Sequence, residues 1–105
     1  MATVRHYFYT YHEGAGFLPG RERTFEFAGS WRDRAVAATA GPLAAAILFY
    51  PADIRMLAVT QVAVAVEPKH QGYGRGDPAS LEVTIKNMGT TPIFFYFLSL
   101  ADIAQ

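Results

Sequence analysis

The chain has 105 residues, of which 51% are apolar and 17% are charged, and its nine basic residues balance nine acidic ones. This length accommodates one domain with a single core, and a net charge of zero provides no field that would attract nucleic acid or an anionic membrane. The absence of cysteine excludes a disulfide framework, a thiolate nucleophile and a cysteine-ligated zinc site.

The low charge content also bears on partners. Ordinary domains contain roughly 25% charged residues, so a small chain with this much apolar surface is expected to cover part of it with another subunit. A net charge near zero further reduces the repulsion between copies. We therefore expect a homo-oligomer, with no nucleic-acid or membrane partner.

The N-terminal residues do not resemble a targeting segment. Residues 1–7 lack the basic stretch followed by an apolar stretch that a signal peptide requires, so a cytoplasmic location is the default expectation and release by a route other than Sec stays open. The longest apolar run, residues 35–50, is interrupted by Gly41 and Pro42 and is shorter than the roughly 20 residues of a spanning helix.

Residues 4–12 alternate in polarity and predict a first strand. One face carries Val4, His6, Phe8 and Thr10, and the other carries Arg5, Tyr7, Tyr9 and Tyr11. Because tyrosine tolerates partial solvation, the tyrosine row is expected to form a cross-strand aromatic ladder, or else to line an interface or a ligand groove.

A loop and a short second strand follow. Residues 13–20 contain three glycines and one proline, which predicts a loop. Residues 24–27 then alternate again, so that Phe25 and Phe27 should face the core and Glu26 should face water.

Residues 30–40 fit two structures. Ser30 and Asp33 resemble a helix-capping box, and the alanine-rich stretch after them ends at Gly41 and Pro42, as a short helix would. The segment nevertheless lies among predicted strands and continues into residues 43–50, which suit a buried strand. We favour two strands bent at Gly41 and Pro42, followed by a turn at residues 51–53.

Residues 54–66 form the longest alternating run, and both of its faces are largely apolar. Such a pattern is typical of a central strand in a sandwich, or of a strand that a partner subunit covers on one side.

Residues 69–77 belong to a polar, glycine-containing loop, and long loops on a rigid β scaffold commonly carry function. Four of its side chains form the candidate ligand-binding set: His70, Tyr73, Arg75 and Asp77. An aromatic platform beside polar groups suits carbohydrate, because a sugar has one apolar face and several hydroxyl groups. The alternative is a solvated turn that binds nothing.

No catalytic or metal-binding constellation is recognisable, and no cofactor is expected. His6 and His12 share a strand face but lie roughly 20 Å apart along it, too far to hold one metal ion. We therefore expect the protein not to be an enzyme.

Residues 81–100 give the strongest local pattern. Residues 81–86 alternate, residues 87–90 contain a glycine turn, and residues 93–98 are β-branched and aromatic. This order predicts a β-hairpin.

The second strand of that hairpin carries large apolar groups on both faces, of which an outer strand of a monomer buries only one. We take Phe94, Tyr96 and Leu98 as the set that meets another chain. The other alternating set, Ile93, Phe95 and Phe97, is the alternative surface, and complete burial inside the monomer is a further alternative. Trp31 is added to the interface set, although it equally suits the core.

These patterns predict an all-β fold: one antiparallel β-sandwich over residues 1–105, with about six or seven strands, of the lectin-like or immunoglobulin-like kind. The expected function is that of a non-catalytic, self-associating module that binds carbohydrate through residues 69–77. The alternative is a structural subunit of a homo-oligomeric shell, fibre or multi-protein complex, with no small-molecule ligand.

Overall fold

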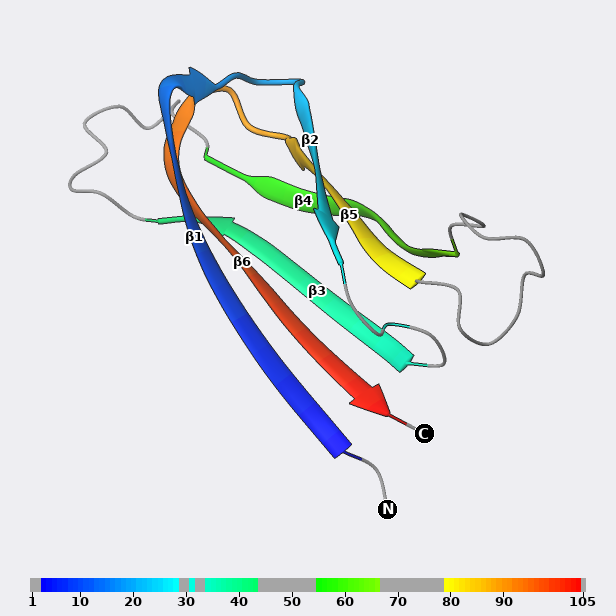
Figure 1. Cartoon of the computed structure of the whole chain (residues 1–105). Helices are drawn as coiled ribbons and strands as arrows, with labels where there is room; N and C mark the ends of the chain where they lie inside the picture. Colours follow the sequence, from blue (N-terminus) through cyan, green and yellow to red (C-terminus); the bar gives the residue numbers. More distant parts are fainter. Residues whose placement is uncertain (1–2, 29–30, 32–33, 44–54, 67–78, 105) are drawn as a thin grey trace.

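In the residues that the structure describes, the protein is an all-β sandwich of two three-stranded antiparallel sheets (Figure 1). The computed structural model describes residues 3–28, 31, 34–43, 55–66 and 79–104. Its strands are β1 (Thr3–Phe17), β2 (Glu22–Phe27), β3 (Arg34–Pro42), β4 (Leu57–Val66), β5 (Ala79–Asn87) and β6 (Ile93–Ala104). Sheet A has the order β1-β6-β3 and sheet B the order β2-β5-β4, which confirms the predicted all-β antiparallel sandwich. Within the described residues no helix is long and apolar enough to cross a membrane.

The core lies between the two central strands. Buried apolar side chains of β5 and β6 form most of it, and these are Leu81, Val83, Ile85, Ile93, Tyr96, Leu98 and Leu100. The tyrosines of β1 and the phenylalanines of β2 close one side of this core, where they are partly buried. Two strands from different sheets thus supply most of the buried apolar area, the main favourable contribution to folding.

Strand β1 shows the predicted alternation and is longer than predicted. Tyr7 and Tyr9 point into the sandwich, whereas Val4 and Phe8 point outward and are 51% and 63% exposed. The strand continues through Phe17, because that residue still pairs with Ile93 of β6. The predicted loop at residues 13–20 therefore begins only after Phe17.

Strand β3 resolves the choice between helix and strand in favour of the strand. Residues Arg34–Pro42 pair with β6 in regular register, from Arg34 opposite Ala104 to Pro42 opposite Tyr96. Proline is tolerated there because β3 is at an edge of the sheet. Except for Leu43, the strand predicted at residues 43–50 and the turn predicted at residues 51–53 lie outside the described residues.

The predicted β-hairpin is wrong, although both of its strands exist. β5 belongs to sheet B and β6 to sheet A, so no ladder joins them. Their apolar faces meet across the core instead of pairing side by side. The alternating pattern shows that each segment is extended, but it does not show which strand pairs with it.

Buried Asn87 holds the connection between β5 and β6. Its side-chain Nδ2 donates to the carbonyl oxygens of Phe17 at 2.7 Å and Thr91 at 3.1 Å. Its Oδ1 accepts a hydrogen bond from the backbone N–H of Gly89 at 2.9 Å. One amide thus pairs with three backbone groups where the chain crosses from one sheet to the other.

The central-strand prediction for residues 54–66 is also wrong for the described strands. β5 is the centre of sheet B and β4 lies at its edge. The register shifts between Val59 and Gln61, so that Val59 lies opposite Ile85 and Val62 opposite Val83. A shift of one residue moves side chains to the other face, which explains why strict alternation along the sequence places apolar residues on both faces.

Candidate self-association surface

The outward side of sheet A is a continuous surface without a charged residue, and we call it the outer face. Its members come from all three strands. They are Val4, His6, Phe8, Thr10 and His12 from β1, Phe95, Phe97, Ser99, Ala101 and Ile103 from β6, and Ala35, Ala37, Thr39 and Gly41 from β3. Phe8 and Phe95 are 63% and 47% exposed.

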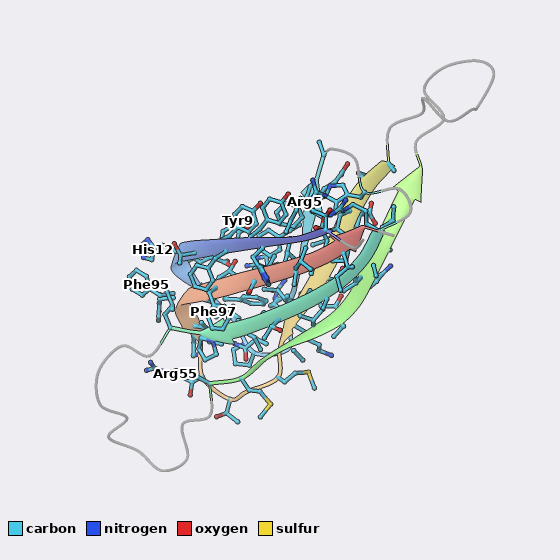
Figure 2. The ribbon with its side chains drawn as sticks, turned by 90° about the horizontal axis from the view of Figure 1, so that it is seen from below. Arg5, Tyr9, His12, Arg55, Phe95 and Phe97 are labelled. Carbon is cyan, nitrogen blue, oxygen red and sulfur yellow. The ribbon has the colours of Figure 1, made fainter. Side chains whose placement is uncertain are left out.

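Rings on the outer face pack across neighbouring strands. Phe8 stacks on Phe97 with ring centroids 5.5 Å apart, and His12 stacks on Phe95 at 4.5 Å. Figure 2 shows His12, Phe95 and Phe97 near the same end of sheet A. Gly41 lies under the Phe97 ring, where an added Cβ would come within 2.8 Å of a ring carbon. The glycine therefore lets this ring lie across β3, close to the sheet.

Charge is absent from the outer face because the charged side chains of sheet A turn inward. Asp102 of β6 is fully buried between Arg5 of β1 and Arg34 of β3. Arg5 Nε donates to Oδ1 at 2.9 Å, and Arg34 Nε donates to Oδ2 at 2.8 Å. The hydrogen bonds from Arg5 and Arg34 hold the pKa of the Asp102 carboxyl far below its ordinary value, against the opposing effect of burial.

A second charged group, at the other end of β1, also faces inward. Glu13 accepts hydrogen bonds from Arg23 at 2.8 Å and from the Tyr96 hydroxyl at 2.6 Å. Burial, and then this bond to the carboxylate, raises the pKa of Tyr96 well above its ordinary value. Arg23 belongs to β2, so the Glu13 carboxylate connects the two sheets.

The structure corrects three of the four residues predicted for the interface. Tyr96 and Leu98 are buried in the core, at 2% and 0% exposure, and only Phe94 reaches the surface, at 45%. Trp31 is 5% exposed and packs on Tyr7, with ring centroids 5.8 Å apart. Its indole Nε1 donates to the Ala28 carbonyl at 3.3 Å, so Trp31 closes the edge of the core.

The error on β6 is the choice of the wrong alternating set, and a register shift also breaks the alternation at the start of the strand. Pairing with β1 moves from His12 opposite Phe95 to Phe17 opposite Ile93, and Gly16 within the shift has a φ of 85°. Ile93 and Tyr96 therefore both face inward although they are three residues apart. The residues of β6 that could meet another chain are consequently Phe95 and Phe97, from the alternative set.

The contribution of β1 to this surface was missed in the sequence, although a signal was present. Arg5 and Glu13, the two charged residues of the strand, both lie in the alternating set that contains the tyrosines. Because both charged residues of β1 lie on the side that faces into the sandwich, the outward-facing set, which includes Val4 and Phe8, has no charged residue.

The predicted ligand-binding residues His70, Tyr73, Arg75 and Asp77 lie outside the described residues, so their role stays a prediction. Where the structure is described, no group of three histidine or carboxylate side chains could hold a metal ion.

Comparisons of the chain with protein-family models, curated proteins and solved structures give no significant match. Function must therefore be inferred from the surfaces of the molecule itself.

Proposed function

We propose that this chain is a non-catalytic structural subunit that self-associates by packing its outer face on the outer face of a second copy. The observation that carries this proposal is a three-stranded face with exposed Phe8, Phe95 and Ile103 and no charged side chain. Contiguous apolar patches of more than a few hundred Å² are uncommon on monomers and typically mark interfaces.

A second copy fits this face better than a partner of another kind. In a two-fold symmetric pair the same patch meets itself, so a charged residue near the symmetry axis would be brought close to its own copy. The outer face contains no such residue, and the whole chain has no net charge. A strongly charged partner would find no complementary group there.

The size of the outer face is compatible with a weak to moderate dimer. β6 has 12 residues, which makes the face about 40 Å long and, across three strands, about 14 Å wide. Two such faces cover roughly 1,100 Å², near the lower limit of specific interfaces, about 1,200 Å². Protruding phenylalanine rings add to the area that is buried.

Sedimentation velocity of the full chain tests self-association. We expect a species of twice the 11.5 kDa chain mass, with a dissociation constant on the order of micromolar for an interface of this size. A single species of 11.5 kDa at every concentration up to roughly a hundred times that value would contradict the proposal. Since a two-fold contact closes as a dimer, a fibre or shell would require a second, different contact.

Carbohydrate binding through residues 69–77 is a second proposed function. It is supported by the grouping of His70, Tyr73, Arg75 and Asp77 in the sequence. In the sequence these residues lie between β4 and β5, and the two strands pair up to Val66 opposite Ala79. Segments that connect paired strands commonly carry binding residues.

A further inference from the structure

A cleft of about 300 Å³ lies on the other side of β1, between its inward side chains and β2. Its lining includes Arg5, Tyr7, Tyr9, Glu26, Phe27 and Trp31. Figure 2 shows Arg5 and Tyr9 along β1, with Arg5 towards the end of the strand opposite His12. Alternation along β1 separates this cleft from the outer face, so a ligand in the cleft would leave the self-association surface free.

Aromatic rings form most of the cleft wall. Tyr7 and Tyr9 are nearly parallel, with centroids 6.5 Å apart and an interplanar angle of 8°. Tyr9 also contacts Phe27 at 5.1 Å, and Tyr7 contacts Trp31 at 5.8 Å. A row of tyrosines with a tryptophan provides apolar surface together with hydroxyl groups that form hydrogen bonds.

The charges of the cleft argue against an ionic ligand. Arg5, Arg34 and Asp102 together carry one net positive charge, and the Glu26 carboxylate in the cleft lining balances it, which leaves little attraction for an anion. The Arg5 guanidinium carbon already lies 5.6 Å from the Tyr7 ring centroid and 5.4 Å from that of Trp31. A cationic ligand would therefore meet a like charge beside these rings. Glu26 is exposed, and no other described residue forms an ion pair with it.

We propose that this cleft binds a neutral saccharide. One apolar sugar face would lie against the tyrosine rings, and sugar hydroxyls would donate hydrogen bonds to the Glu26 carboxylate. The volume is at the lower end of the range for ligand pockets, about 300–1,000 Å³, which suits one or two sugar residues. The proposal rests on residues other than 69–77, and it does not depend on self-association.

Fluorescence titration of the full chain tests the site directly, because Trp31 is its only tryptophan and lines the cleft. The probes are glucose, galactose, N-acetylglucosamine and the disaccharides cellobiose, lactose and chitobiose. At least one is expected to change the Trp31 emission in a saturable way. Glu26→Gln should then weaken binding by about tenfold or more, the cost of a lost hydrogen bond to a charged group.

Glu22→Gln is the matched control, because Glu22 lies on the same exposed side of β2 and does not line the cleft. It should bind with the wild-type affinity, and both variants should keep the wild-type circular dichroism because the substituted side chains are exposed. Three results with the neutral probes would overturn the proposal. They are no saturable change in Trp31 emission with any probe, equal affinities of Glu26→Gln and Glu22→Gln, or binding that is lost in Tyr73→Ala and kept in Glu26→Gln. Stronger binding of glucuronate by Glu26→Gln than of any neutral probe would also overturn it, and would identify an anion site.

Discussion

Replacing Phe8 with glutamate is expected to convert the self-associated protein into a monomer. Phe8 is 63% exposed in a single chain and lies on the outer face, so the substitution removes little from the core. Full burial of a phenylalanine contributes about 2 kcal/mol; the part of Phe8 that is still exposed accounts for about 1.3 kcal/mol of this, and a symmetric pair loses it twice. A loss of about 2.5 kcal/mol weakens the dissociation constant somewhat less than about a hundredfold, before the repulsion between two carboxylates is counted.

The control for this substitution is Met88→Glu, which adds the same charge elsewhere. Met88 is 52% exposed and lies in the connection between β5 and β6, away from the outer face. Sedimentation of the two variants at equal concentration should give a monomer for Phe8→Glu and a dimer for Met88→Glu. Equal dimer fractions in the two variants would place the contact somewhere other than the outer face.

Replacing Asp102 with asparagine should lower the free energy of unfolding by about 3 kcal/mol, the typical cost of breaking a buried ion pair. Asp102 connects all three strands of sheet A, because its partners Arg5 and Arg34 lie on the two strands that flank β6. Asparagine keeps the shape but leaves two inward guanidinium groups without a counter-charge. Their pairing also keeps the charged set of β1 on the inward side, which leaves the outer face free of charge.

The same carboxylate predicts how stability depends on pH. The pKa of Asp102 is lower in the folded chain than in the unfolded chain, so its contribution is fully present above the ordinary carboxylate pKa. The contribution is lost as the pH falls below about 4, where the unfolded chain takes up a proton before the folded chain does. Asp102→Asn should therefore lose less stability than wild type between pH 5 and pH 3.

Urea unfolding measures both the loss of stability in Asp102→Asn and its dependence on pH. The substitution is best made in the Phe8→Glu protein, because dimerisation would add to the apparent stability. Glu22→Gln in the same protein controls for the loss of one exposed carboxylate. If Asp102→Asn unfolds at the same urea concentration as the control, the carboxylate does not hold sheet A together.

The sequence predicts strand positions better than strand partners. Alternation places the side chains of β1 correctly because β1 pairs with β6 in unbroken register from Thr3 to His12. It fails for β5 and β6, since a period of two is the same whether two segments pair in one sheet or face each other across a core. It also fails at Thr60 and near Gly16, where register shifts exchange the faces.

The self-association surface could be predicted only in part for the same reason. Residues 93–98 correctly indicate a strand with large apolar groups on both faces, but the set that faces outward depends on how β6 pairs with β1. The contribution of Phe8 depends on the pairing of Arg5 with Asp102, residues almost the full chain length apart. Contacts of that separation are a property of the fold and cannot be read from local pattern.

Hydroxyl-radical footprinting of the full chain over a range of concentrations tests the proposed surface most directly. Phe8 and Phe95 are exposed in the monomer to about the same degree as Met88, at 63%, 47% and 52%, and Met88 is the internal reference. We expect oxidation of the two phenylalanines to fall relative to that of Met88 as the concentration rises, because a second copy covers them. A constant ratio of oxidation at all concentrations would contradict self-association through the outer face.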